Sequence, residues 1–350
     1  MNSNNSNVNE RTSKKHTPEN ILVTGGGGFL GKAIVERLVV RGDRVRSFSR
    51  SSHPALDALG VEQVQGEISD GIAVSRACEG VDTVFHTAAK AGVWGKYQTY
   101  HRTNVVGTRN VIVACRNSDV QHLIYTSSPS VIFDGSNMRG VDESTPYPDR
   151  YTAHYPRTKA MAEQAVVQAA AEGLPAIVLR PHLIWGPEDN HLVPRIIQRA
   201  GQLRRVGDGS NLVDTIYIDN AAEAHILAAD KLSVDPTLSG NIYFISQGEP
   251  VSLWEMVDAI LHAGGLQPVQ KSIPAGTARL IGTFLEFVYT LFRVKSEPRL
   301  TRFVAKELST DHWFDISAAE RDLGYSPRVS TQEGLEHLSK WLGDRSAQWQ

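Results

Sequence analysis

The chain has 350 residues and a formal net charge of −2 at pH 7, and 41% of its residues are hydrophobic while 21% are charged. This composition is typical of a globular protein with one large α/β domain and room for a smaller lobe, and the balanced charge argues against a nucleic-acid partner. Because two cysteines, Cys78 and Cys115, are too few for a disulfide framework or a zinc site, we expect buried, reduced thiols, no metal and a cytoplasmic location.

The first 18 residues differ from the rest of the chain. They are rich in Asn, Ser, Thr and Lys, and their only clearly apolar members are Met1 and Val8. Such a segment cannot bury enough surface to offset its loss of conformational entropy, and it lacks the apolar stretch of a signal peptide. We expect a disordered tail over residues 1–18.

A glycine-rich turn follows the first apolar run, Ile21–Thr24, and leads into a helical pattern over Phe29–Val40. Its glycines have the GxxGxxG spacing of a dinucleotide-binding turn: the first permits a tight turn, the second lets the backbone approach a pyrophosphate, and the third lets the helix lie close to the sheet. The start of the helix would offer free N–H groups to the phosphates. The expected cofactor-binding residues of this turn are Gly25, Gly28, Phe29, Leu30 and Gly31.

The second apolar run, Val45–Phe48, ends in Ser49, Arg50 and Ser51, without an acidic residue. An NAD site has a carboxylate at this position that binds the ribose 2′-hydroxyl. Serine hydroxyls and a guanidinium are instead suited to a 2′-phosphate. We therefore expect NADP(H), with NAD(H) as the less favoured cofactor; the alternative is that Arg50 is simply a solvated loop residue.

Further short apolar runs alternate with helical patterns, which predicts a Rossmann-type, doubly wound parallel sheet of the α/β class. We place this NADP-binding domain at residues 19–185, with residues 211–246 returning to it. A smaller, mainly helical substrate-binding lobe is expected at residues 186–210 and 247–345. The remaining expected strands and helices are Val61–Val64, Thr83–His86, Leu123–Thr126, Ala176–Leu179 and Asn241–Ile245, and Val105–Cys115 and Tyr155–Glu172.

Tyr155 and Lys159 are four residues apart and would share one face of a helix. A free tyrosine has a pKa of about 10, and a nearby ammonium would lower it, so that Tyr155 could exchange a proton with a carbonyl oxygen or an alcohol. The pair follows the fifth strand, which ends in Ser127 and Ser128, and ligands of open parallel sheets bind beyond the carboxyl ends of the strands. Taken alone, such a pair also occurs on ordinary surfaces, and serines also cap turns.

An amphipathic helix is predicted over Leu280–Phe292. It is shorter than the roughly 20 apolar residues that a membrane span needs, and polar residues recur along one stripe of it. Its broad apolar face would shelter alkyl chains, contact a bilayer surface or belong to the core.

Together these motifs resemble the extended short-chain dehydrogenase/reductases, from Asn20 to about Leu342. Within that group the chain is similar to the 3β-hydroxysteroid dehydrogenase branch, and in particular to its bacterial reductases of 2-alkyl-3-oxoalkanoates in olefin biosynthesis. The resemblance implies NADPH-dependent reduction of a β-keto acid with two long alkyl chains, and a homodimer. The motifs are Thr24–Gly31, His86–Ala89, Asn104–Thr108, Ser127–Ser128, Tyr155 with Lys159, Leu179–Pro181, Ile184–Pro187, Tyr217–Asn220 and Leu323–Pro327.

The resemblance also implies residue roles. Tyr155 would be the acid/base, Lys159 would bind the nicotinamide ribose, and Ser128 would polarise the carbonyl, with Ser127 as the fallback. Asn104 would support the site, or act only as a structural amide. Many relatives carry Asp where this chain has Glu67, which makes the adenine contact less certain. The further implied cofactor contacts are Glu67, Ile68, Ala88, Ala89, Lys159, Pro181 and Leu183.

Three other functions remain open. A 3β-hydroxysteroid or sterol dehydrogenase would use the same catalytic residues. An NAD-dependent nucleotide-sugar epimerase or dehydratase is disfavoured by the missing acidic residue, although Arg195, Arg204 and Arg205 could bind a pyrophosphate. A dinucleotide-binding sensor without catalysis would have no need of Tyr155 and Lys159. In the preferred interpretation the partner is a hydrophobic small molecule, with peripheral membrane contact through Leu280–Phe292 as a further expectation.

Overall fold

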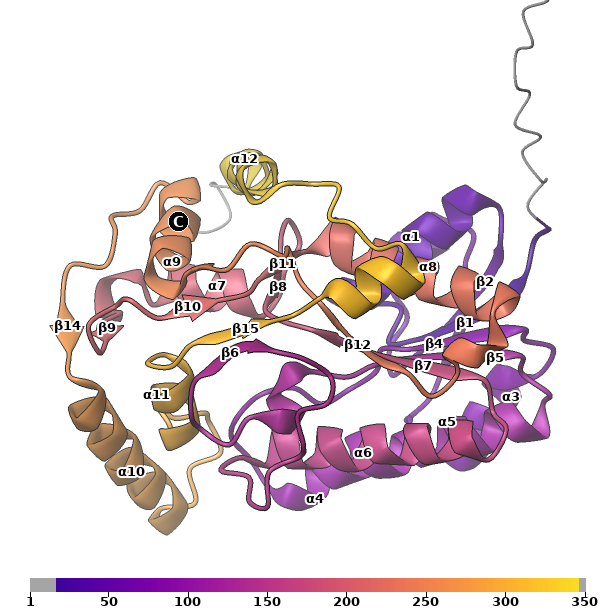
Figure 1. The fold of residues 1–350 in the computed structure, drawn as a ribbon, viewed down its shortest axis with the longest axis horizontal. Helices are drawn as coiled ribbons and strands as arrows, with labels where there is room; N and C mark the ends of the chain where they lie inside the picture. Colours follow the sequence, from indigo (N-terminus) through magenta and orange to yellow (C-terminus); the bar gives the residue numbers. More distant parts are fainter. Residues whose placement is uncertain (1–16, 346–350) are drawn as a thin grey trace, which may run out of the picture.

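A seven-stranded parallel sheet lies at the centre of the computed structural model, which describes residues 17–345 (Figure 1). The tail expected over residues 1–18 lies almost entirely outside the described residues. The strand order is β12-β7-β5-β4-β1-β2-β3, so the chain reverses direction across the sheet between β1 and β4. The strands are β1 (Asn20–Thr24), β2 (Arg44–Ser49), β3 (Glu62–Gln65), β4 (Thr83–His86), β5 (His122–Thr126), β7 (Ala176–Pro181) and β12 (Ile242–Ile245).

The Rossmann-type fold is thereby confirmed, and each predicted strand matches an observed strand within two residues at either end. Helices cover both faces, as Figure 1 shows, with α1 (Phe29–Arg41) and α8 (Ile218–Val234) on one face. The opposite face carries α3 (Gly71–Cys78), α5 (Gly107–Asn117) and α6 (His154–Ala171).

Burial on both faces explains why the strands are apolar along their whole length. Side chains of a strand alternate between its two faces, so Ile21 and Val23 belong to the core beneath α1 and α8, while Leu22 belongs to the core beneath α3, α5 and α6. The second core also contains Cys78 and Cys115, both buried as free thiols.

The smaller lobe is mainly helical, as predicted, and also contains strands that the sequence patterns did not predict. Its helices are α7 (Leu192–Gln198), α9 (Leu253–Ala263), α10 (Ala275–Leu291), α11 (Arg302–Glu307) and α12 (Thr331–Asp344). A four-stranded sheet joins β13 (Val251–Ser252), β10 (Leu212–Val213), β15 (His312–Phe314) and β6 (Met138–Val141). Strands of two to four residues are too short to show a periodicity. Since β6 precedes α6 in the chain, this sheet connects the lobe to the Rossmann part.

Two further pairs of short strands are present. β8 (Ile184–Trp185) pairs with β11 (Ile216–Tyr217), and β9 (Arg205–Val206) pairs with β14 (Ser272–Ile273). None of the helices within residues 17–345 combines the length and the apolar character needed to cross a bilayer.

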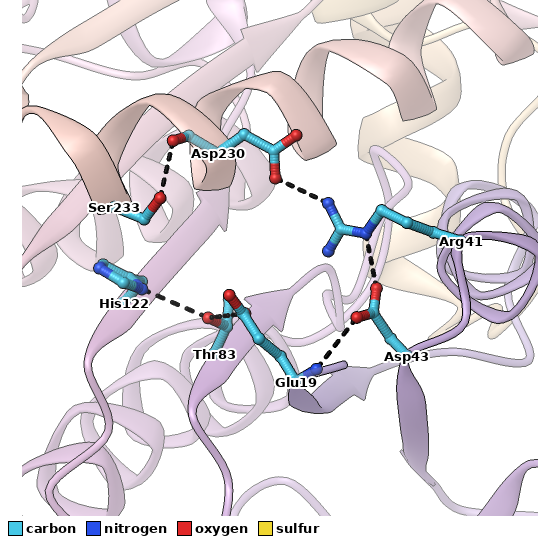
Figure 2. A network of polar contacts seen from close by, with 7 residues as sticks. All are labelled: Glu19, Arg41, Asp43, Thr83, His122, Asp230 and Ser233. Carbon is cyan, nitrogen blue, oxygen red and sulfur yellow. Dashed lines mark hydrogen bonds and ion pairs between the residues drawn. The ribbon is translucent and has the colours of Figure 1, made fainter. Parts of the chain in front are cut away.

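A polar network lies at the edge of the central sheet where the strands begin (Figure 2). The guanidinium of Arg41, on α1, donates hydrogen bonds of 2.6 Å to Asp43 and to Asp230 of α8. Asp43 also accepts from the backbone N–H of Glu19, whose carboxylate accepts from the Thr83 hydroxyl. Ligands of open parallel sheets bind at the opposite edge. We therefore interpret this network as one that fixes α1 and α8 on the sheet.

Candidate active site

The glycine-rich turn at the carboxyl end of β1 fits a pyrophosphate. Gly25 has φ of 74°, the left-handed conformation that favours glycine. A Cβ atom on Gly31 would overlap the carbonyl oxygen of Gly25, so this glycine lets α1 pack directly against the turn. Gly28 is the N-cap of α1 and provides no side-chain cap, and the first turn contains no acidic residue. The first N–H groups of α1 are therefore available to phosphate oxygens.

Two features of this turn were not predicted. A Cβ atom on Gly26 would lie 2.5 Å from the hydroxyl of Ser47, whose buried oxygen has no hydrogen-bond partner within residues 17–345. The imidazole of His53 lies so close to Gly27 that a Cβ atom there would overlap the ring. Gln63 holds the backbone of His53 through hydrogen bonds of 2.8 and 3.2 Å, which places the loop after β2 over the glycine turn.

The expected 2′-phosphate contacts lie on this loop. Arg50 is exposed, and its guanidinium makes no hydrogen bond or ion pair with residues 17–345. The hydroxyl of Ser49 donates to the carbonyl of Ser51 over 2.7 Å. Glu67 is exposed at the end of β3, whereas Ile68 is buried against Gly107 of α5. Arg50 and Glu67 are thus the more accessible of these expected contacts.

The other side of the cofactor groove is formed by the segments after β4 and β7. A Cβ atom on Gly25 would lie 3.1 Å from the backbone of Ala88, so this backbone adjoins the glycine turn, and Ala89 follows it. Pro181 is buried at the end of β7. Leu183, two residues later, has φ of 44°, which is uncommon for a side chain of this kind. Such backbone strain is concentrated at functional sites.

Tyr155 lies in the first turn of α6, and its phenol faces Ser128 at the end of β5. Burial raises the pKa of Tyr155 above its usual value, a hydrogen bond with Ser128 partly offsets this, and the charge of Glu307 raises the pKa further. The Ser128 hydroxyl is held by the backbone N–H (3.2 Å) and the hydroxyl (3.0 Å) of Ser130. Ser127 is buried, and its hydroxyl has no hydrogen-bond partner within residues 17–345. The geometry therefore favours Ser128 over Ser127.

Lys159 is buried one turn further along α6. Its ammonium donates hydrogen bonds of 2.7 Å to the hydroxyl of Tyr125 and 2.5 Å to the carbonyl of Thr126, and it lies 4.2 Å from the centroid of the Tyr125 ring. Burial lowers the pKa of Lys159 to about 7, against an opposing effect of Glu163.

These contacts correct one expectation. Lys159 was expected to lower the pKa of Tyr155, but the pKa of Tyr155 is raised. Two physical reasons apply: the ammonium of Lys159 is directed at β5, and a lysine with a pKa of about 7 has lost much of its charge before a buried phenol ionises.

Asn104 lies in a π-helical segment, His101–Val106, between α4 (Tyr97–Tyr100) and α5. Its amide oxygen accepts from the N–H of Lys90 over 2.7 Å, and its amide nitrogen donates to the carbonyl of Lys90 (3.2 Å) and the hydroxyl of Thr158 (3.0 Å). With 2% of its surface exposed, it connects the loop after β4 to α6, one residue from Lys159. These contacts suit a residue that positions the site.

A buried ion pair lies beneath the site. Arg180 of β7 donates two hydrogen bonds, of 2.5 and 3.1 Å, to Glu163 of α6, and neither side chain is more than 1% exposed. Glu163 also accepts from the hydroxyl of Tyr147 over 2.6 Å. This cluster attaches α6, which carries Tyr155 and Lys159, to the central sheet.

Three titratable side chains near the site were not selected from the sequence: Glu307 and His312 of the lobe, and His182 after β7. Glu307 ends α11 and lies near enough to Tyr155 to raise its pKa; burial raises the pKa of Glu307 itself to about 8. The rings of His182 and His312 lie 5.5 Å apart, edge to face. Burial lowers the pKa of both, that of His312 to about 4. At neutral pH this wall of the site therefore carries no charge.

Residues 22–274 match the sequence model of the 3-beta hydroxysteroid dehydrogenase/isomerase family. The chain belongs to this family. The matched region contains the glycine turn, Ser128, Tyr155 and Lys159, but ends before Glu307. Within residues 17–345 no group of three or more His, Cys, Asp or Glu side chains could hold a metal ion.

Individual proteins of similar sequence are also reductases or dehydrogenases by name. The chain is 50% identical to the 2-alkyl-3-oxoalkanoate reductase of Stenotrophomonas maltophilia, over 91% of this chain and 98% of the relative. It is 49% identical to the enzyme of the same name from Shewanella oneidensis, over 92% and 86%. The solved UDP-glucuronic acid 4-epimerase of Bacillus cereus in complex with NAD has a TM-score of 0.72 at 22% identity, over 93% and 99%, which shows the shared fold alone.

The protein is therefore an oxidoreductase of the short-chain dehydrogenase/reductase type that acts on alcohol and ketone groups. A nicotinamide dinucleotide is the class of cofactor that this family and the glycine turn support.

Proposed function

We propose that the protein uses NADPH to reduce a long-chain 2-alkyl-3-oxoalkanoate to the 3-hydroxy acid. The observation that carries this proposal is the 50% identity to the Stenotrophomonas reductase over 98% of that enzyme. The test is a stopped assay with NADPH against a 2-alkyl-3-oxo acid, a 3-ketosteroid and a nucleotide sugar. Turnover of the oxo acid alone is expected, and turnover of only one of the others would contradict the proposal.

Each catalytic residue has a role in this reaction. Ser128 donates a hydrogen bond to the keto oxygen, and Tyr155 donates its proton to the same oxygen. Lys159 binds the nicotinamide ribose, and Asn104 positions α6 through Thr158. The bound nicotinamide would supply the hydride. The raised pKa of Tyr155 supports the reductive direction, because a phenol that stays protonated at neutral pH is a ready acid. The phenolate that forms regains its proton from solvent.

We further propose that Arg50, with Ser49 and Ser51, binds the 2′-phosphate of NADP(H). A hydrogen bond to a charged group contributes about 1.5–3 kcal/mol, so Arg50→Ala should raise the Kd of NADPH about 10–100-fold and that of NADH far less. Fluorescence titration measures both constants. Arg44→Ala, at the opposite end of β2, is the matched control and should change neither. Equal losses for NADPH and NADH would contradict this role for Arg50.

We propose a cytoplasmic location with a peripheral contact between the apolar face of α10 and a bilayer. Leu280, Phe284, Phe287 and Leu291 recur at helical spacing and are 61–73% exposed. Exposed basic residues flank this face: Arg279 directly precedes Leu280, and Arg293 and Lys295 follow Leu291. An apolar face with basic flanks suits a surface of anionic lipid.

The double variant Phe284→Ser/Phe287→Ser should therefore lose at least about tenfold in binding to vesicles of anionic lipid, because two exposed aromatic side chains would no longer enter the bilayer. Co-sedimentation measures this loss. Ile72→Ser, which changes an exposed side chain on α3, is the control.

We also propose a homodimer, as the resemblance implies, and light scattering of the same variants tests it. If the double variant has a lower molecular mass in solution but binds vesicles as the natural protein does, the α10 face is the dimer interface and not a membrane contact.

The second candidate function is a 3β-hydroxysteroid dehydrogenase. The name of the matched family favours it, and Ser128, Tyr155 and Lys159 would serve oxidation of a sterol hydroxyl equally well. No comparable observation favours a nucleotide-sugar epimerase, because that likeness shows the fold alone.

A further inference from the structure

The end of α11 is held over the catalytic residues by packing. The ring of Phe303, on α11, meets Phe133 edge to face at 5.8 Å, and Phe133 follows the short helical turn Pro129–Ile132 that begins at Ser128. A Cβ atom on Gly282 of α10 would overlap the backbone at Thr301, so α10 is packed closely against the start of α11. This packing places Glu307, the last residue of α11, opposite Tyr155.

Glu307 is a carboxyl group without a partner. It makes no side-chain hydrogen bond or ion pair with any of residues 17–345, although it is half-buried. Burial of an ionised carboxylate without a partner is costly. Burial therefore raises the pKa of Glu307 to about 8. At neutral pH the group is therefore a carboxylic acid, which has one O–H donor and no acceptor for it among residues 17–345.

Three titratable side chains around Glu307, those of Tyr155, His182 and His312, are also uncharged at neutral pH. Tyr155 faces it from α6, and the ring of His312, on β15, contacts its main chain. His182 lies next to His312 at the end of β7, and both imidazoles are neutral. The neighbouring Lys306 extends to Gly135, beside Asp134. On the α10 side, Glu286 is paired with Arg302 of α11 over 2.7 Å.

An anionic substrate in this cleft would therefore meet hydrogen-bond donors and no fixed cation at this wall. A 3-oxo acid carries its carboxylate two carbons from the keto carbon, so both groups must be bound within the same cleft. A carboxylic acid is a strong donor to a carboxylate, because such O–H···O⁻ hydrogen bonds are charge-assisted. Ser128 and Tyr155 would bind the keto oxygen, and Glu307 is an unpartnered donor near Tyr155.

We propose that Glu307 recognises the substrate's carboxylate: in its neutral form it donates a hydrogen bond to that carboxylate while Ser128 and Tyr155 bind the keto oxygen. The proposal rests on the proposed reduction of a 3-oxo acid and assigns a specificity-determining residue to it. A ligand without the carboxylate, such as the methyl ester, gains nothing from this contact.

The proposal has a defined pH dependence. Below about pH 8 Glu307 is neutral and binds the carboxylate, whereas above it Glu307 is ionised and repels the carboxylate. The preference for acid over ester should therefore be constant at low pH and fall about tenfold for each pH unit above the pKa of Glu307. Titration of Tyr155 affects both compounds and cancels in the ratio.

The test uses a stable 2-alkyl-3-hydroxy acid and its methyl ester, each oxidised with NADP⁺ by the full-length protein between pH 6 and pH 10, a range of about two units on either side of the pKa of Glu307. The ratio of the two kcat/KM values should fall with pH for the natural protein. For Glu307→Gln, which keeps a donor and cannot ionise, the ratio should not depend on pH.

A second test measures binding. Glu307→Ala should raise the Kd of the acid at least about tenfold in calorimetry with NADP⁺ present, and leave the Kd of the ester within about twofold. Glu336→Gln, on α12, is the control.

Two outcomes distinguish a failure of this proposal from a failure of the proposed function. If both compounds are oxidised and the acid-to-ester ratio is independent of pH in the natural protein, Glu307 does not bind the carboxylate. If neither compound is oxidised while a hydroxysteroid is, the proposed substrate is wrong and the assignment of Glu307 falls with it. Thermal unfolding of each variant shows that it is folded.

Discussion

Replacement of Tyr155 by Phe is expected to lower kcat at least about a hundredfold, which is the contribution typical of a positioned general acid. Phenylalanine keeps the ring and its packing but removes the hydroxyl that faces Ser128 and donates the proton to the keto oxygen. The backbone and glycine contacts that would hold the dinucleotide are untouched, so the Kd of NADPH should stay within about twofold.

Steady-state turnover of the oxo acid and fluorescence titration of NADPH measure the two effects separately. The matched control is Tyr151→Phe, on the loop before α6, whose hydroxyl donates to the carbonyl of Val131 over 2.8 Å and does not face Ser128. The control should retain nearly full turnover. Normal turnover of Tyr155→Phe would remove Tyr155 from its catalytic role.

The largest expected effect on stability comes from Glu163→Ala. This change leaves the guanidinium of Arg180 buried and unpaired, and removal of one partner of a buried ion pair costs about 3–5 kcal/mol. It also removes the acceptor of the Tyr147 hydroxyl. Urea denaturation measures the free energy of unfolding. Glu163→Leu combined with Arg180→Met should recover most of the loss, because an apolar pair of similar volume often replaces a buried ion pair without cost.

Glu172, the C-cap of the same helix, provides the matched control. It also pairs with an arginine, Arg116, over 2.7 Å, but in solvent. Because exposed ion pairs contribute little, Glu172→Ala should leave the unfolding midpoint nearly unchanged. An equal midpoint for Glu163→Ala would show that the buried pair does not anchor α6 to β7.

The residues that sequence alone identified are those whose chemistry depends on near neighbours in the chain. The apolar runs alternate with helices because a strand buried on both faces is apolar throughout, and this local pattern predicted the Rossmann sheet. The glycine spacing predicted the turn because each of its steric requirements lies within seven residues of the chain, from Gly25 to Gly31. The four-residue spacing of Tyr155 and Lys159 predicted, for the same reason, that the two residues lie one turn apart on a helix.

Only the tertiary structure decided which way these groups point and what lies opposite them. The ammonium of Lys159 is directed at Thr126 of β5 and does not lower the pKa of Tyr155. Burial of the phenol raises that pKa instead. His53 covers the glycine turn from a separate loop. Glu307 lies near enough to Tyr155 to influence its pKa because Phe303 packs against Phe133. Contacts between distant segments depend on the packing of whole helices and strands, and no periodicity within one segment encodes them.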